Sequence, residues 1–272
     1  MYGAILGDII GQPYEFDCGN KTKDFPLFCR NPHFTDDSVM TIAICDGILK
    51  AGIEADENIM KTAMITAMQL WGHKYPHAGY GQRFYMWLAQ EKTKPYNSWG
   101  NGSAMRVSSV GWLFDKLERT REVARWSAEI THNHPEGVKG AEATASVIWM
   151  ARNGYFKAQI KEYVINEFGY DLSRTCDEIR PGYYHVESCQ ETVPEAITAF
   201  LEGNSFEDVI RTAVSLGGDC DTLTDIATSM AEAFYGLPEE MKAKCIEYTE
   251  KDMHEVMKAF DEKAILRKPL EA

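Results

Sequence analysis

The sequence predicts an all-α fold, and two observations support this prediction. Apolar residues recur at three- and four-residue spacing along most of the 272-residue chain, as at Val39, Ile42 and Ile48. Strand signals are scarce, because only residues 183–187 combine aromatic and β-branched side chains in the way a strand does. We therefore expect a single compact orthogonal helical bundle of about a dozen or more helices, formed by one domain over residues 1–272.

The expected helices follow one another with short loops marked by Gly, Pro or Asn. Gly52 ends the first of them, and Ser205 is a candidate N-cap with Asp208 three residues on. Each segment has apolar residues at helical spacing, and their Ala-rich runs indicate that most are buried. In chain order the expected helices are 37–49, 57–71, 81–89, 101–117, 121–131, 136–151, 156–168, 194–201, 206–216, 222–235 and 239–258.

Composition and charge narrow the class of protein. Hydrophobic residues at 44% and charged residues at 25% are typical of a globular domain. A net charge of −13 argues against a nucleic-acid groove or an anionic membrane surface as the main partner, so nucleic acid is expected only as a modified substrate. An anionic substrate would need local help from metals, helix N-termini or a few placed cations.

Cysteine usage and the N-terminus predict a cytoplasmic location. The seven cysteines contain no CxxC spacing, which favours reduced thiols. The first residues have no basic segment, and Asp8 interrupts their apolar run, unlike a signal peptide. No apolar stretch approaches the roughly 20 residues of a membrane span. The sequence has no signal for an oligomeric state.

Two short acidic segments, Thr35-Asp36-Asp37 and Asp219-Cys220-Asp221-Thr222, lie far apart in the chain. Each precedes an apolar periodic run and is expected at a helix N-terminus, where free amide groups and the helix dipole stabilise negative charge. Brought together, their carboxylates and hydroxyls would hold hard divalent cations. Either segment alone reads as an ordinary acidic N-cap. Their similarity favours a two-metal hydrolase.

A glycine-rich segment, Ser98-Trp99-Gly100-Asn101-Gly102, precedes another expected helix. Small residues there would let a phosphate reach backbone amides at the helix N-terminus. Trp99 could stack on a nucleobase, or it could be a half-buried packing residue. The segment Gly79-Tyr80-Gly81 could line the same ligand or be a connector. His132 could donate a hydrogen bond to a phosphate or ribose, or it could be satisfied by the backbone.

In combination these motifs resemble one family, the ADP-ribosylglycohydrolases, which include the dinitrogenase reductase-activating glycohydrolase. The resemblance covers nearly the whole chain. It rests on five motifs in order, which are the opening segment 3–16, the segment 34–40, the segment 100–106, Thr131-His132 and the segment 217–222. It implies an all-α fold, two magnesium or manganese ions, and cleavage of a glycosidic bond between ADP-ribose and a modified protein or small molecule.

The resemblance also implies a role for each matching residue. The metal ligands would be Thr35, Asp36, Asp37, Asp219, Asp221 and Thr222. The ADP-ribose contacts would be Gly79, Tyr80, Gly81, Ser98, Trp99, Gly100, Asn101, Gly102 and His132. Glu15 matches a glutamate on a mobile loop, and Glu15 or Asp37 would guide the attacking water. Residues 224–228 depart from the family pattern, so the packing behind the metals could differ, with Asp225 as a supporting acceptor or a solvated charge.

Two other functions fit the same motifs. One is a non-catalytic ADP-ribose-binding or structural protein on this fold, and the other is a two-metal phosphohydrolase that cleaves the diphosphate and yields AMP. Intact metal positions rank the non-catalytic protein below the enzyme. No motif in the loops 17–31 and 155–190 identifies the leaving group, which could be arginine, serine, an acetylated ribose, poly(ADP-ribose), a nucleobase or a metabolite.

Overall fold

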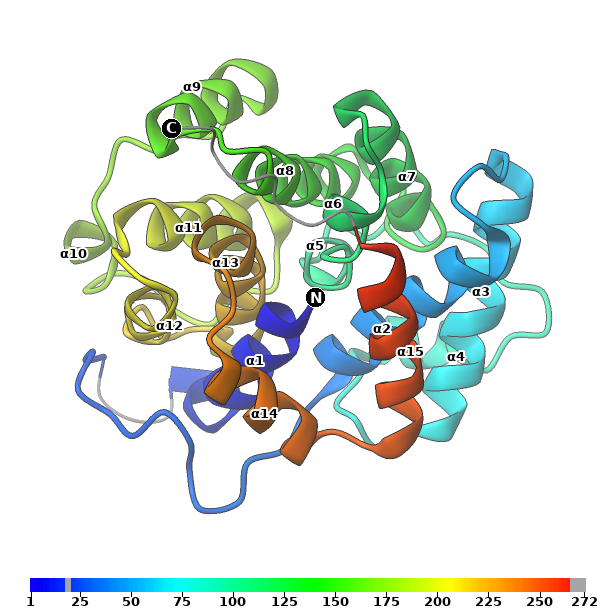
Figure 1. The fold of residues 1–272 in the computed structure, drawn as a ribbon, viewed down its shortest axis with the longest axis horizontal. Coiled ribbons are helices and arrows are strands. Elements are labelled where there is room, and N and C mark those ends of the chain that lie inside the picture. The colour runs from blue at the N-terminus through cyan, green and yellow to red at the C-terminus, as the bar shows by residue number, and fades with distance from the viewer. Residues whose placement is uncertain (18–20, 265–272) are drawn as a thin grey trace.

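The structure is a computed structural model that describes residues 1–17 and 21–264. It confirms the all-α prediction (Figure 1), because the described residues form helices joined by loops, with one isolated antiparallel bridge between Gly100 and Ser188. Residues 18–20 of the loop 17–31, and residues 265–272, lie outside the described part. The helices are α1 Tyr2–Gly11, η1 Gln12–Asp17 (a 3-10 helix), α2 Asp36–Ala51, α3 Glu57–Lys74, α4 Gln82–Leu88, α5 Gly102–Met105, α6 Val110–Leu113, α7 Leu117–Glu129, α8 Pro135–Arg152, α9 Lys157–Phe168, α10 Cys176–Ile179, α11 Cys189–Glu202, α12 Phe206–Val214, α13 Cys220–Tyr235, α14 Glu239–Tyr248 and α15 Lys251–Lys263.

Helices α1 and α13 form the centre of the fold and pack closely on each other (Figure 1). All of α1 is buried, and so is α13 from Cys220 to Ala233. Gly3, Gly7 and Gly11 share the face of α1 that meets α13, and a Cβ at any of them would lie under 3.0 Å from backbone atoms of α13. The glycines therefore allow the two backbones to approach closely.

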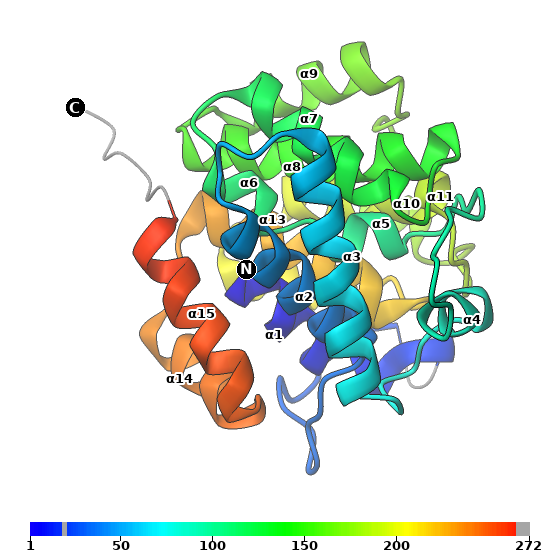
Figure 2. The ribbon, with the colours of Figure 1, turned by 90° about the vertical axis from the view of Figure 1, so that its right-hand side faces the viewer.

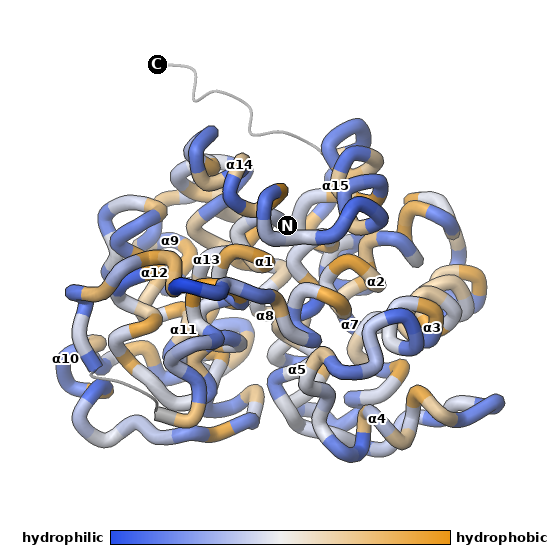
Figure 3. Tube along the Cα trace, turned by 90° about the horizontal axis from the view of Figure 1, so that it is seen from below, coloured by the Kyte–Doolittle hydropathy of each residue, from blue (hydrophilic) through white to orange (hydrophobic). Residues whose placement is uncertain are grey.

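The other helices cover this pair from several sides. In Figure 2, α7, α8 and α9 lie above it, while α14 and α15 lie to one side, against α1 and α2 respectively. Hydrophilic segments occur at the periphery of the tube view, and apolar stretches occur in α1 and α13 (Figure 3). Among the described residues, no helix is long and apolar enough to cross a membrane.

Helix ends follow the local signals in the sequence. Ser205 caps α12, because its hydroxyl accepts a hydrogen bond of 3.1 Å from the amide of Asp208. Thr35 caps α2 and Asp56 caps α3 in the same way. Gly52 follows the last turn of α2 at φ +87°, a conformation that favours glycine. The predicted cap at Ser205 and the predicted end at Gly52 are both confirmed.

Several expected boundaries were wrong, each for a local reason. The helix expected over 101–117 is two four-residue helices, α5 and α6, because 3-10-type bonds such as Val110 N–H to Val107 C=O tighten the chain between them. The expected helix 239–258 divides into α14 and α15 beside Thr249, whose hydroxyl bonds back to the Cys245 carbonyl.

Other differences concern proline, the strand signal and glycine-rich helices. Helix α11 begins at Cys189 rather than Pro194, so the proline lies inside the helix. Residues 183–187 form no strand. Helix α1 was not predicted, because its three glycines lower helix propensity and only its packing on α13 compensates. Helix α10, which is four residues long, was also missed.

Candidate functional site

A cavity of about 320 Å³ opens beside the N-termini of α2 and α13. It is lined by the side chains or backbone of thirteen residues predicted from sequence, contributed by segments across the whole chain. These are Glu15, Asp36, Asp37, Gly79, Gly81, Ser98, Gly100, Asn101, Gly102, His132, Asp219, Asp221 and Thr222. The fold therefore brings both acidic segments and the glycine-rich segment into one cavity, as the motifs had suggested.

The N-terminus of α2 is fixed by a buried aspartate from α1. Asp8 is fully buried, and its carboxylate accepts hydrogen bonds of 2.8 Å from both the amide and the hydroxyl of Thr35. It also accepts a bond of 3.1 Å from the amide of Ser38, whose hydroxyl makes a further short contact. Thr35 therefore serves the cap and does not line the cavity, while Asp36 and Asp37 follow it into the site.

The glycine turn at Gly79 holds Asp36 in place from the other side. The amide of Asp36 donates a bond of 2.8 Å to the carbonyl of Ala78. Gly79 adopts φ +106°, and a Cβ there would lie 3.3 Å from the Asp36 carboxylate. The turn therefore requires glycine for its backbone conformation and also leaves room for the carboxylate.

The second acidic segment enters α13 through two glycines. Gly217 and Gly218 both have φ of +76°, and Asp219 then takes the N-cap position of α13. Asp219, Asp221 and Thr222 are 4–5% exposed, so three oxygen-bearing side chains are held nearly out of solvent at this helix end. The geometry directs them into the cavity beside the carboxylates of α2.

Asn101 joins the glycine-rich segment to this acidic segment. Its side-chain amide donates bonds of 2.5 Å to Asp219 and 3.1 Å to Thr192, and its backbone amide donates to the Glu187 carbonyl. A charge-assisted bond to a buried carboxylate fixes that carboxylate's orientation. Asn101 therefore positions Asp219 in addition to lining the cavity.

Five carboxyl groups crowd together here, and we call Glu15, Asp36, Asp37, Asp219 and Asp221 the carboxylate cluster. Burial raises the pKa of all five above ordinary values. Neighbouring carboxylates add to this for Glu15, Asp36, Asp37 and Asp221, and the pKa reaches about 7 for Glu15 and about 8 for Asp36. The Oδ1 atom of Asp37 is buried without a hydrogen-bond partner. A group of buried acids with an unpartnered oxygen fits divalent cations as counterions, since these take carboxylate and hydroxyl ligands.

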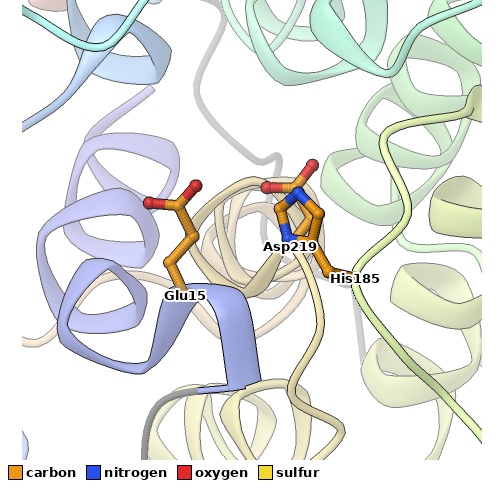
Figure 4. A group of neighbouring side chains, drawn as sticks. All are labelled: Glu15, His185 and Asp219. Atoms are coloured by element: carbon orange, nitrogen blue, oxygen red, sulfur yellow. The ribbon is translucent and has the colours of Figure 1, made fainter.

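A histidine that the sequence did not suggest lies beside the cluster. One potential ligand atom from each of Glu15, His185 and Asp219 lies within 4.8 Å of the others (Figure 4). Figure 4 shows Glu15 on the N-terminal segment, across from Asp219 and from His185 on its loop. These three residues could together hold one cation. No motif marked His185, because its place depends on the loop that precedes α11.

The segment carrying Glu15 has an irregular backbone. Phe16 adopts φ +56°, which is uncommon for a side chain of this size, and its ring stacks on His185 with centroids 4.6 Å apart. Phe16 is 65% exposed at the cavity mouth. The stacking contact therefore joins the Glu15 segment to the loop that carries His185, above the carboxylate cluster.

His132 is held in one orientation by a buried chain of hydrogen bonds. Arg106 donates bonds of 2.8 Å to the Ser127 carbonyl and the Thr131 hydroxyl, and that hydroxyl lies 2.7 Å from Nδ1 of His132. Thr131 satisfies both neighbours if it accepts from Arg106 and donates to Nδ1, which leaves the proton of the neutral ring on Nε2. Burial, with Arg106 and Arg83 nearby, lowers the pKa of His132 well below its usual value. A Cβ at Gly102 would lie 3.3 Å from Nε2, so this atom borders the glycine-rich turn.

Two predicted contacts have side chains outside the cavity lining. Trp99 is 49% exposed and its ring meets His134 edge-on, and Tyr80 packs against Phe84. The aromatic residues that do line the cavity are Phe16, Phe84 and Tyr96. Sequence reasoning missed these three, since no spacing distinguishes them from other packing aromatics.

Asp8 and Asp225 are further acids that the motifs did not assign. Asp225 is fully buried, so it is not a solvated charge, and neither of its carboxyl oxygens has a hydrogen-bond partner among the described residues. Burial and the nearby Asp8 raise its pKa well above the usual value. Both residues lie at the junction of α1 and α13, where Gly7 leaves room for the backbone of Asp225. The only signal for Asp8 in the sequence was a charge inside an apolar run.

The chain is similar to known proteins over nearly its whole length. The family model described as ADP-ribosylglycohydrolase matches residues 1–269. ADP-ribosylhydrolase ARH3 from Homo sapiens is 24% identical over 93% of this chain and 90% of that protein. ADP-ribosylarginine hydrolase Tri1 from Pseudomonas putida (strain GB-1) is 23% identical over 87% of this chain and 70% of its own length. A solved structure titled ADP-ribosylglycohydrolase-related protein complex shares the fold, with a TM-score of 0.68 at 20% identity over 97% of this chain and 95% of that one. The chain therefore belongs to the ADP-ribosylglycohydrolase family.

Proposed function

We propose that this protein is a metal-dependent hydrolase that reverses ADP-ribosylation by cleaving the glycosidic bond between ADP-ribose and a protein side chain or small molecule. The observation that supports it most is the carboxylate cluster, because five acids from both ends of the chain share one cavity with a glycine-rich segment and a neutral histidine. Family membership and the names of the relatives, which are hydrolases of ADP-ribosylated substrates, support the same activity.

The residues that would hold two magnesium or manganese ions are Thr35, Asp36, Asp37, Asp219, Asp221 and Thr222. Divalent cations bound there would orient the ribose hydroxyls and acidify a water molecule. Thr35 reaches the site less directly than the others, because its hydroxyl donates to Asp8. His185 and Glu15 would complete the ligand set on the outer side of Asp219.

Glu15 and Asp37 are the candidate bases. Bond cleavage at the anomeric carbon develops oxocarbenium character, and a carboxylate that takes a proton from the attacking water assists it. Glu15 has a pKa raised to about 7 by burial and by Asp219, so it could accept a proton near neutral pH. Asp37 is 3% exposed with a free Oδ1, and would act from the inner side of the cavity.

The ADP-ribose would lie along the glycine-rich turn. Ser98, Gly100 and Gly102 leave backbone and small side chains at the cavity wall, where Nε2 of His132 could donate to a phosphate or a ribose oxygen. Gly79 and Gly81 border the opposite wall. In this arrangement the reacting ribose meets the carboxylate cluster, and the leaving group points toward Phe16 and the loop carrying His185.

The test is a panel of ADP-ribosylated substrates with product analysis. The protein, with magnesium or manganese, is incubated with ADP-ribosylated arginine and serine peptides, acetylated ADP-ribose and poly(ADP-ribose), and products are separated by mass spectrometry. We expect intact ADP-ribose from at least one substrate, and none with EDTA. Release of AMP would indicate the phosphohydrolase alternative. Tight binding of ADP-ribose without turnover of any substrate would indicate the non-catalytic alternative.

A further inference from the structure

Two arginines line the cavity without a carboxylate partner. Arg83 comes from α4, and Arg106 follows α5. Within residues 1–17 and 21–264, neither guanidinium forms an ion pair, and their hydrogen bonds go to neutral oxygens of Tyr96, Ser127 and Thr131. Uncompensated positive charge beside a cavity is a feature of anion-binding sites.

Arg83 is the accessible member of this pair. Its guanidinium carbon lies 4.8 Å from the ring centroid of Tyr96, and one terminal nitrogen donates to the Tyr96 carbonyl. A guanidinium has five N–H donors, so most of those of Arg83 remain available to a ligand. Arg106 is 1% exposed and acts within the wall, through Thr131, on the orientation of His132.

The short helix after the glycine-rich turn offers a diphosphate little stabilisation. A phosphate at the N-terminus of a long helix gains from many aligned peptide dipoles, but α5 has only four residues, Gly102–Met105. The other charged residues of the cavity lining are the five acids of the carboxylate cluster and Glu187, and carboxylates repel a diphosphate. The chain as a whole carries a net charge of −13. A side-chain cation beside this turn would therefore add charge that its backbone amides alone do not supply.

We propose that Arg83 is the residue that selects the diphosphate of the ligand, holding its two negative charges at the part of the cavity wall formed with Tyr96 and His132. The inference rests on the proposed function, since it assigns a residue to the ADP-ribose that the hydrolase would bind. The ring of Tyr96 packs against the guanidinium, and the neutral ring of His132 offers a hydrogen-bond donor near it. Arg83 thereby makes binding depend on ligand charge, which adenosine lacks.

The test compares ligands of different charge on variants of Arg83. Dissociation constants for ADP-ribose and for adenosine are measured by calorimetry with the wild type, Arg83→Gln and Arg83→Lys. The control is Arg30→Gln, which removes the same charge from an exposed side chain that does not line the cavity. We expect Arg83→Gln to weaken ADP-ribose binding about 10- to 100-fold, as for loss of a charge-assisted hydrogen bond, and to leave adenosine binding unchanged. Arg83→Lys should recover part of the loss, and Arg30→Gln should match the wild type.

Two further measurements distinguish a charge effect of Arg83 from a packing effect, and test the assignment of Arg83 independently of the proposed hydrolase activity. Raising the salt concentration should weaken ADP-ribose binding to the wild type more than to Arg83→Gln, and KM should rise in that variant with kcat little changed. Unchanged ADP-ribose affinity in Arg83→Gln, or an equal loss for adenosine, would overturn the assignment of Arg83 alone. A wild type that binds ADP-ribose through Arg83 but hydrolyses nothing would overturn the proposed function alone.

Discussion

Removal of divalent cations should lower the melting temperature of this protein, and by more at pH 8 than at pH 5.5. An ion that binds only the folded state at 100 times its dissociation constant stabilises that state by about 2.7 kcal/mol. A chain of 272 residues unfolds with an entropy of about 0.6 kcal/mol per kelvin. Each occupied site should therefore raise the melting temperature by about 5 °C, and two sites by about 9 °C.

The pH dependence follows from the raised pKa values of the carboxylate cluster. Without metal, the folded state keeps protons on Glu15 up to a pKa of about 7 and on Asp36 up to about 8, whereas the unfolded chain releases them near pH 4. The folded state thus binds more protons between about pH 4 and pH 8, so its stability falls as pH rises through that range. Cations compete with those protons, and their stabilising effect grows toward pH 8.

The assay is calorimetry or dye-based melting at both pH values, with EDTA or with excess manganese. Asp221→Asn removes one charge from the carboxylate cluster, so it should lose most of the metal effect while leaving the metal-free protein as stable as the wild type or more stable. Asp24→Asn, an exposed control without a side-chain hydrogen bond in the structure, should behave like the wild type. Equal melting temperatures with EDTA and manganese at pH 8 would refute the reasoning, as would a metal effect retained in full by Asp221→Asn.

Three other changes have defined outcomes. Glu15→Gln should lower kcat at least about 100-fold, as for loss of an electrostatic contact in the transition state, while calorimetry shows ADP-ribose affinity within about 3-fold of the wild type. Trp99→Ala should change ADP-ribose affinity, measured by calorimetry, less than Tyr96→Ala does, because only Tyr96 lines the cavity, where its ring supports the guanidinium of Arg83. Gly7→Ala places a Cβ 2.3 Å from a side-chain oxygen of α13, so it should lower the melting temperature by at least about 3 °C. The control Gly81→Ala, whose Cβ would have no atom within 4 Å, should melt like the wild type.

The sequence predicted the parts of the fold that depend on local signals. Helical periodicity, the cap at Ser205 and the end at Gly52 are properties of short segments, and the structure contains them. The break between α5 and α6 was not predictable in this way. It depends on tertiary partners, since Thr41 bonds to the Met105 carbonyl and Arg152 bonds to the Gly111 carbonyl. Helix α1 depends equally on its packing against α13, which begins at Cys220, far along the chain.

In the candidate site, too, the sequence predicted the residues that lie in local motifs and missed those that only the fold brings together. The acidic segments and the glycine-rich turn were found because their residue types and order are informative by themselves. Three other residues of the site have no sequence motif, and only the fold places them there. Asp8 is a buried acid in an apolar run, His185 lies on an irregular loop, and Arg83 is an exposed arginine on α4. No spacing rule separates such residues from ordinary ones. Trp99 is the opposite case, because it lies in a recognisable glycine-rich motif and was predicted to contact the ligand, yet its side chain lies outside the cavity lining.

Adjacent residues of α1 connect the core of the protein to its candidate site. Gly7 faces α13 and allows that helix to approach, while Asp8 faces α2 and accepts the hydrogen bonds that fix Thr35 and Ser38. Four members of the carboxylate cluster come from the N-termini of α2 and α13, two from each, so the distance between these two pairs is set by how α1 packs between the helices. A change that shifts α1 should therefore weaken cation binding as well as stability. By this argument the loss of cation affinity in Gly7→Ala should exceed any loss in Gly203→Ala, because Gly203 is also tightly packed but meets Val209 of α12, away from the cluster.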